Sequence, residues 1–139
     1  MQTYEGRETL IELKPDCIRD ILIAIRDCPE SGQLVFSSFD EMRELLDLEQ
    51  YSAVEIEYHA RECDMEGLLT GTVFGCSGDF LVSGITPMAH RFLDAAKRPG
   101  VWPRFKARSL KGGEKMVDTL FGIAQSIAVD AISTQFGLR

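Results

Sequence analysis

Hydrophobic side chains recur every three or four residues in several stretches of the chain, which is the spacing of an amphipathic helix. The first stretch begins at Pro15, a residue suited to a first helical turn, and should end near Cys28 because Pro29 follows. A second helix is expected over residues 42–48, with Ser38 or Asp40 as its N-cap.

A third helix is indicated at residues 52–55, whose sequence Ser-Ala-Val-Glu has the form of a capping box. Gly67 should end this helix. We expect its buried side to be formed by Val54, Tyr58, Met65 and Leu68.

Short apolar runs typical of strands follow a different pattern. Residues 34–36 form one such run, and residues 68–74 and 80–85 form two more on either side of a glycine-rich segment, 75–79. The last two runs predict a β-hairpin. Thr86 followed by Pro87 then predicts the start of a fourth helix, and residues 99–110 should form a short connecting segment.

The last predicted element is a long amphipathic helix from Glu114 onward. It carries few charges along its middle, so one of its faces needs a partner. We expect a second copy of the chain there, and the alternative is that the helix docks on its own domain. The residues expected at the dimer interface are Met116, Leu120, Ile123, Ile127 and Ala131.

The order helix, short strand, helix, helix, hairpin, helix is that of a winged helix-turn-helix domain, with the third helix in the recognition position. We therefore predict an α+β fold of this type with an additional long C-terminal amphipathic helix. Residues 1–14 would form an N-terminal arm, residues 15–110 the winged-helix domain, and residues 111–139 the C-terminal helix that mediates oligomerisation.

Two segments of the chain resemble a known family. Residues 85–102 read ITPMAHRFLDAAKRPGVW, and residues 51–69 read YSAVEIEYHARECDMEGLL. Both are similar to segments of an uncharacterised bacterial and phage winged-helix family, domain of unknown function 2513, whose members often also carry Lys-Gly-Gly before a terminal helix, as at residues 111–113. The resemblance covers about residues 15–137 and implies the fold, but it brings no established activity or catalytic residue.

The chain departs from the family pattern at a few positions. Ala89 stands where the family often has glycine, and Arg98 and Pro99 stand where it often has acidic residues. The glycine-rich hairpin also lacks the basic residues that a DNA-contacting wing would prefer. The resemblance therefore supports the fold better than it supports a function.

Charge is unevenly distributed along the chain, whose formal net charge is −7. Residues 1–70 hold 17 acidic and 6 basic side chains, whereas residues 71–139 hold 5 acidic and 9 basic side chains. The two halves should therefore face different partners, or each other. Because the overall charge gives no attraction to a polyanion, nucleic-acid binding would need a local basic patch.

The composition, with 45% hydrophobic residues, is that of a folded domain. No uninterrupted apolar run approaches the roughly 20 residues that cross a bilayer, and the N-terminus lacks the apolar core of a secretory signal. We expect a cytoplasmic protein with no membrane contact. The four cysteines form no CxxC pair and should stay reduced.

Nothing in the sequence indicates an enzyme active site. The only histidines are His59 and His90, neither in a recurring metal motif, and His59 is expected to be a hydrogen-bonded packing residue. No glycine-rich phosphate motif is present, and GCSG at residues 75–78 lacks the spacing of a nucleophile turn. We therefore expect no catalysis, no metal and no cofactor.

The expected outward side of the third helix is mainly acidic. In a major groove its carboxylates would lie beside phosphates without counter-charge, which disfavours conventional docking on duplex DNA. The alternatives are a basic protein partner or a solvated helix face. The residues expected to contact a protein partner are Glu55, Glu57, Arg61 and Glu62.

A basic patch lies within residues 91–115, interleaved with Trp102 and Phe105. Such a patch suits a phosphate backbone, although it could also meet an acidic protein surface. The residues expected to bind nucleic acid are Arg91, Lys97, Arg98, Arg104, Lys106, Arg108 and Lys111.

Two functions are consistent with this sequence. The first is a dimeric DNA-associated transcriptional regulator of bacterial or phage type that holds phosphates through the basic patch. The second is a non-enzymatic protein-interaction winged helix whose acidic third helix binds a host or partner protein, as a phage-encoded modulator would. Fold analogy favours the first and local charge favours the second. We rank the regulator slightly ahead, because winged helices most often bind nucleic acid, and keep the interaction module as the alternative.

Overall fold

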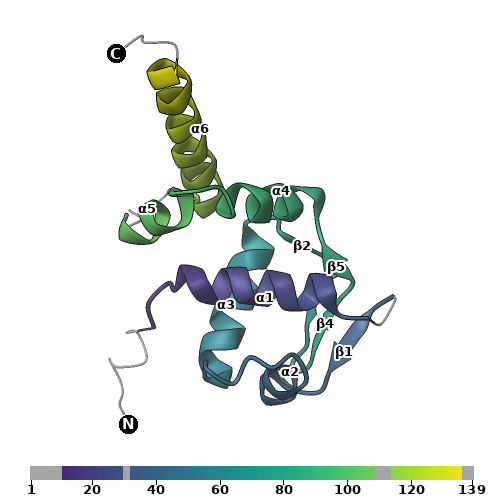
Figure 1. The fold of residues 1–139 in the computed structure, drawn as a ribbon. Coiled ribbons are helices and arrows are strands. Elements are labelled where there is room, and N and C mark those ends of the chain that lie inside the picture. The colour runs from purple at the N-terminus through teal and green to yellow at the C-terminus, as the bar shows by residue number, and fades with distance from the viewer. Residues whose placement is uncertain (1–10, 30–31, 109–113, 136–139) are drawn as a thin grey trace. The chain divides into compact units, whose positions relative to one another are not determined.

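The computed structural model describes residues 11–29, 32–108 and 114–135 of the chain. It shows a mixed α+β architecture in which the described residues form six helices and five short strands (Figure 1). The chain divides into two compact units, residues 1–86 and residues 87–139. The domain boundary expected near residue 110 lies outside the described residues.

In the first unit, helix α1 (Pro15–Asp27) packs against helix α3 (Ala53–Met65). The predicted start of α1 at Pro15 and its end before Cys28 are confirmed. One side of α1 is fully apolar, as the helical spacing predicts. Its buried residues are Cys17, Ile18, Ile21, Leu22 and Ile25.

Helix α3 begins as predicted, with Ser52 and Glu55 forming both hydrogen bonds of a capping box. The side that it buries, however, is not the one predicted. Val54 is 60% exposed and Met65 is 69% exposed, whereas Leu68, just beyond the helix, is buried. The buried residues of α3 are Ile56, His59, Ala60 and Cys63.

The physical reason for this error is that α3 is apolar on two opposite sides. Ile56, Ala60 and Cys63 follow one helical row, and Val54, Tyr58 and Met65 follow another about half a turn away. The row with the smaller residues fits closely against α1, so the other row faces outward. Hydrophobic periodicity alone does not distinguish the two rows.

Helix α2 (Phe39–Leu45) follows strand β1 (Leu34–Phe36), and Ser38 rather than Asp40 is its N-cap. The Ser38 side chain accepts a hydrogen bond from the Glu41 backbone N–H at 3.0 Å. Phe36, Phe39 and Phe80 stack in one cluster, which joins β1, α2 and the hairpin.

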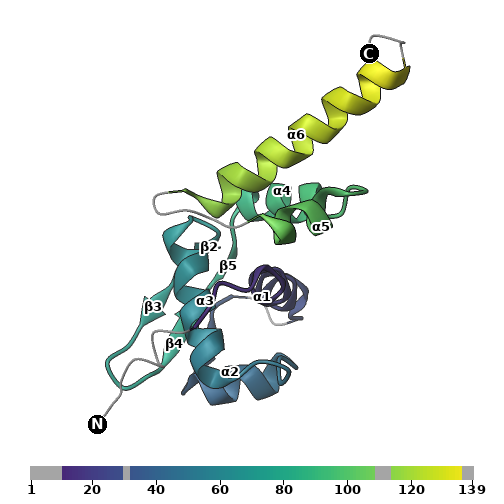
Figure 2. The same cartoon turned by 90° about the vertical axis from the view of Figure 1, so that its left-hand side faces the viewer.

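The predicted hairpin is present but is divided into two short ladders. Strand β2 (Leu69–Thr70) pairs with β5 (Gly84–Ile85), and β3 (Val73–Phe74) pairs with β4 (Phe80–Val82), all antiparallel (Figure 2). Gly71, at φ +69°, separates the ladders where a Cβ would overlap Ser83. Strand β4 also pairs with β1, which gives the sheet order β1-β4-β3.

The second unit consists of helices α4 (Pro87–Ala96), α5 (Val101–Ala107) and α6 (Met116–Gln135). Residues 101–107, expected to be a connecting segment, are helical because Pro103 falls in the first turn, where a missing N–H removes no helical bond. Trp102, Phe105 and Phe92 form edge-to-face and tilted ring contacts in the core of this unit.

The two halves of α6 lie in different environments. Its first half packs on α4 and α5 and buries Met116, Leu120 and Ala124. Its second half extends beyond these helices (Figures 1 and 2), and Val129 and Ile132 are about half exposed, at 52% and 53%. Among the described helices, α6 alone is long and apolar enough, over Met116–Ser133, to cross a membrane by length and composition, which is weak evidence by itself.

We expect Ile56→Ala to lower the free energy of unfolding by about 2–5 kcal/mol, because Ile56 is fully buried between α3 and its neighbours. The matched variant Val54→Ala, on the exposed row, should change it by less than about 0.5 kcal/mol. Urea denaturation followed by circular dichroism measures both. A larger loss in Val54→Ala than in Ile56→Ala would show that α3 buries the other row.

Candidate binding surfaces

The outward side of α3 carries an apolar row with one arginine in it. Val54, Tyr58, Arg61 and Met65 are spaced by four, three and four residues, so they share one face of the helix. Val54 and Met65 are the most exposed of these apolar side chains, and Tyr58 is half-buried. We call these four residues, with the flanking Glu57 and Glu62, the α3 surface.

Carboxylates lie on both flanks of this row. By helical spacing Glu57 and Asp64 fall on one flank, and Glu62 and Glu66 on the other. Glu57 and Arg61 form an exposed ion pair at 2.9 Å. Burial raises the pKa of Glu62, and the charge of Glu66 raises it further.

Glu55 differs from the other predicted interaction residues because it serves the fold. Its carboxylate accepts a hydrogen bond from the Ser52 backbone N–H at 2.9 Å and also pairs with the Lys14 side chain. The hydrogen bond from Lys14 holds the pKa of Glu55 below its usual value. Glu55 is therefore occupied inside the first unit, whereas Glu57, Arg61 and Glu62 remain at the surface.

Contacts with the hairpin extend the α3 surface onto strand β3. The Arg61 guanidinium lies over the Phe74 ring, 4.4 Å from its centroid. The Thr72 hydroxyl donates to the Asp64 carboxylate at 2.6 Å. Since Val73 beside Phe74 is about half exposed, the apolar surface continues from the helix to the strand.

His59 is a buried packing residue, as predicted, and it uses both ring nitrogens. Nε2 accepts a hydrogen bond from the Lys14 backbone N–H at 2.8 Å, and Nδ1 lies 2.7 Å from the Glu55 carbonyl oxygen. The ring is therefore neutral with its proton on Nδ1, because a protonated Nε2 would face another donor. Burial lowers the pKa of His59 below its usual value.

In the second unit, the predicted basic residues gather around α4 and α5. Arg91, Lys97, Arg98, Arg104 and Arg108 are exposed. Lys106 is exposed too, and Lys111 lies outside the described residues. The interleaved aromatic residues Trp102 and Phe105 are buried, so they are not available to stack on a base.

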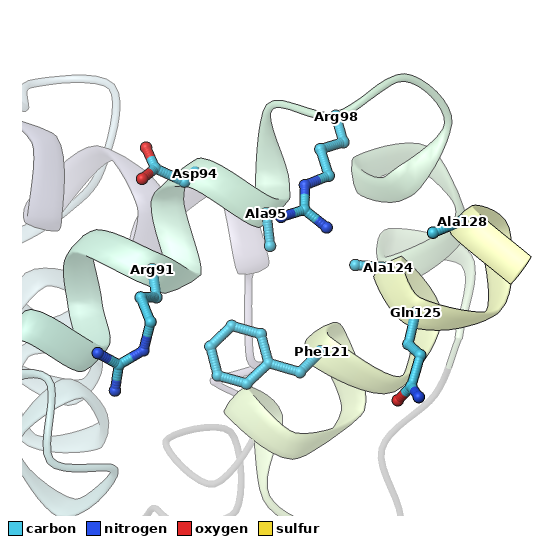
Figure 3. A pocket seen from close by; sticks show the side chains of 8 residues that line it. All are labelled: Arg91, Asp94, Ala95, Arg98, Phe121, Ala124, Gln125 and Ala128. Carbon is cyan, nitrogen blue, oxygen red and sulfur yellow. The ribbon is translucent and has the colours of Figure 1, made fainter.

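A groove of about 500 Å³ lies between α4 and α6 (Figure 3). The Phe121 ring lies between the side chains of Arg91 and Arg98, and Asp94 points away from it. Arg91 and Arg98 form no ion pair with any residue in the described part of the chain. The residues lining this α4–α6 groove are Arg91, Asp94, Ala95, Arg98, Phe121, Ala124, Gln125 and Ala128.

A second groove, of about 380 Å³, lies between α5 and α6. Arg104 and Arg108 line it from α5, and Asp118 lines it from α6. Arg108 is paired with Glu114 at 2.8 Å, so Arg104 is the less compensated cation of this α5–α6 groove.

The predicted dimerisation residues are divided between the interior and the surface. Met116 and Leu120 are buried, Ile123 and Ile127 are half-buried, and Ala131 is exposed. The first two residues hold α6 to its own unit. The exposed apolar side chains lie further along the helix, at Val129 and Ile132.

Within the residues that the structure describes, no group of three or more metal-ligating side chains comes together. Cys17 and Cys63 are buried, and burial raises the pKa of Cys17 to about 12. Both thiols are therefore protonated at neutral pH and function as small core residues.

Comparison with protein families gives one match, to the model of a family of hypothetical proteins, DUF2513, over residues 12–115. The chain belongs to this family. The match spans both segments that resemble DUF2513, residues 51–69 and 85–102. No curated protein and no solved structure matches the chain.

Two features of these surfaces could not be predicted from the sequence. The outward position of Val54, Tyr58 and Met65 depends on which apolar row meets α1. The position of Phe121 beside the arginines depends on how α6 packs on α4, and these two helices are far apart in the sequence. A helical-wheel plot of α3 shows both apolar rows and is the only sequence signal for the first feature.

We expect the free energy of unfolding to fall as the pH is lowered below about 6.5, because unfolded His59 then binds a proton that the buried ring does not. The variant His59→Gln should be less stable at pH 7 by about 1–3 kcal/mol and should show a smaller loss on acidification. Urea denaturation at a series of pH values between neutral and mildly acidic compares the two slopes. Identical slopes in the two proteins would contradict a neutral His59.

Proposed function

We propose that the first unit is a winged-helix domain and that the protein is a non-enzymatic interaction module, which binds a basic and apolar segment of a partner protein through the α3 surface. The observation that carries this proposal is the second apolar row of α3, in which Val54 and Met65 are exposed and Tyr58 is half-buried. This helix is the one proposed to stand in the recognition position.

The topology of the first unit supports the winged-helix interpretation. Its elements follow the order α1, β1, α2, α3 and a hairpin, and β1 pairs with the second strand of that hairpin, β4. In winged-helix proteins the third helix is the element that meets the target and the hairpin is the wing. In the proposed winged-helix domain, the α3 surface and strand β3 would take these two roles.

Charge argues against duplex DNA as the target of this surface. Helix α3 carries Arg61 as its only arginine or lysine, and that residue is paired with Glu57. The hairpin tip, residues 75–79, has Asp79 and no basic residue. Each of these carboxylates would approach phosphates without counter-charge, so binding would lack the cation displacement that stabilises protein–DNA complexes.

The same composition suits a protein partner. Tyrosine, methionine and arginine are enriched at protein interfaces, where they supply apolar contact area in a polar rim. Here the rim is acidic on both flanks, with Glu57 and Glu62 nearest the row. The complementary partner is a segment with apolar side chains along its middle and lysine or arginine at its edges.

The DNA-associated regulator is the second candidate, and a specific observation favours it. Arg91, Arg98 and Arg104 line two open grooves of the second unit and form no ion pair in the described part of the chain. A polyanion held there would bind by a face other than the recognition helix. The bacterial or phage setting of either function, including the role of a phage-encoded modulator, stays a prediction.

We further propose that the protein forms a homodimer through the second half of α6. Val129 and Ile132 lie one turn apart on the part of the helix that extends beyond α4 and α5. A second α6 would cover them with the same kind of apolar side chain. The expected absence of membrane contact and the cytoplasmic location are part of this proposal.

A charge reversal tests the α3 surface. The variant Glu57→Lys/Glu62→Lys should bind a synthetic amphipathic peptide of leucine and lysine at least about tenfold more weakly than the wild type, a loss of about 1.4 kcal/mol. Isothermal titration calorimetry gives the affinities, and two-dimensional NMR of the labelled protein should place the shifted signals on α3 and β3.

The matched control is Glu44→Lys/Glu49→Lys, which makes the same change in net charge at two exposed positions of the first unit. It should retain most of the affinity. Equal losses of affinity in both variants would show that the peptide responds only to net charge, which would overturn the proposal. NMR signals that shift only outside α3 and β3 would overturn it as well.

Two lysines on α6 test the dimer. Val129→Lys/Ile132→Lys should convert a wild-type dimer into a monomer in sedimentation velocity, because buried ammonium groups would disfavour helix association. The control Val35→Lys/Leu45→Lys alters two exposed apolar residues of the first unit and should leave the dimer intact. A monomeric wild type would refute the proposal, and its co-sedimentation with anionic lipid vesicles would assign Val129 and Ile132 to a membrane.

A further inference from the structure

The α4–α6 groove combines three features that none of the other described hollows has together. It has two guanidinium groups without an ion pair among the described residues, an accessible aromatic ring and a floor of small side chains. Its volume, about 500 Å³, lies within the range of small-molecule and nucleotide sites. We propose that this groove binds single-stranded nucleic acid, with one base stacked on Phe121 and the flanking phosphates held by Arg91 and Arg98.

Both arginines line the same groove. Arg91 lies within α4, and Arg98 lies two residues beyond the helix end at Ala96. Successive phosphates of one strand can therefore meet the two guanidinium groups. Guanidinium groups also suit phosphate oxygens because their N–H donors pair with two oxygens at once.

Phe121 supplies the contact that distinguishes a base from a bare anion. Its ring is half-buried and projects between the two arginines in Figure 3. Ala95, Ala124 and Ala128 beside it leave room for a flat ring to approach. Stacking of this kind tolerates any base, but it requires that the base be unstacked from its neighbours, which favours a single strand over a duplex.

The charges around the groove agree with a polyanion. Asp94, the one carboxylate among the lining residues, points away from Phe121 and lies 3.9 Å from Lys97. On the other side of the same helix α6, Arg104 and Arg108 line the α5–α6 groove. A long polyanion reaches several of these cations, whereas an isolated carboxylate reaches one.

This inference does not depend on the α3 surface. It refines the second candidate function by naming the strand form of the ligand and the groove that holds it. An acidic peptide could also pair with the arginines, but it has no planar ring to match Phe121, so we take the nucleic acid as the occupant and the peptide as an outcome of the test.

The test uses the full chain and a ten-nucleotide single-stranded DNA that carries 2-aminopurine, whose fluorescence falls when it stacks. The wild type should bind the strand with quenching of that fluorescence. Phe121→Leu, which keeps an apolar side chain, should abolish the quenching and weaken binding by roughly tenfold, the order expected for one lost base–aromatic stack.

Arg91→Glu/Arg98→Glu should weaken binding further and should reduce the slope of log K against log salt by about 1.4, because two phosphate contacts are lost from a single strand. The control Arg19→Glu/Arg26→Glu makes the same charge change in the first unit and should leave the quenching in place. Circular dichroism of every variant, with helix content retained, shows that loss of binding is not loss of fold.

Three results would overturn the inference. Duplex DNA that binds as tightly as the strand, with no effect of Phe121→Leu, would leave the regulator candidate standing and remove the stacking site. A mononucleotide that binds as tightly as the strand would make the groove a site for free nucleotides. A glutamate-rich peptide that displaces the strand and binds the Phe121→Leu variant equally well would assign the groove to acidic proteins.

Discussion

The packing of α1 against α3 determines what the first unit can present to a partner. Ile18, Ile21 and Leu22 of α1 are fully buried, and Ile56 and Ala60 of α3 are buried with them. Because this contact uses one side of α3 completely, the opposite side is turned to solvent with whatever residues it carries. His59 reinforces the orientation, since its ring links the backbone before α1 to the first turn of α3 and leaves α3 little freedom to rotate.

Much of the fold could be predicted because helix ends are decided by local chemistry. Pro15, Ser38, Ser52 and Thr86–Pro87 each mark a boundary through a cap or a missing N–H, and these signals are present in a few neighbouring residues. The side of α3 that is buried could not be predicted, because it depends on the shape of a distant helix. The prediction for residues 101–107 was wrong for a related reason: proline breaks a helix interior but not a first turn, and no local signal marks the start of α5.

The candidate surfaces show the same division. The acidic character of α3 and the basic character of residues 91–108 follow from counting charges, and the structure places these charges at the surface. Which charges remain available does not follow from counting. Glu55 forms part of a helix cap, and Arg108 forms an ion pair. The aromatic residues expected to accompany the arginines are buried, whereas Phe121 of helix α6 lines the groove beside them.

Charge is separated between the two units, so binding of a basic partner by α3 and binding of a polyanion would use different parts of this chain. In the described residues of the first unit, carboxylates outnumber basic side chains, and most of the exposed arginines belong to the second unit. The acidic helix α3 repels phosphates, so a chain of this composition gains affinity for a polyanion only where the arginines form no ion pair. For the apolar side chains of Val54 and Met65 the preferred charge is reversed. Their burial would be most favourable against a partner whose basic edge neutralises the flanking carboxylates. The two proposed functions would therefore select ligands of opposite charge.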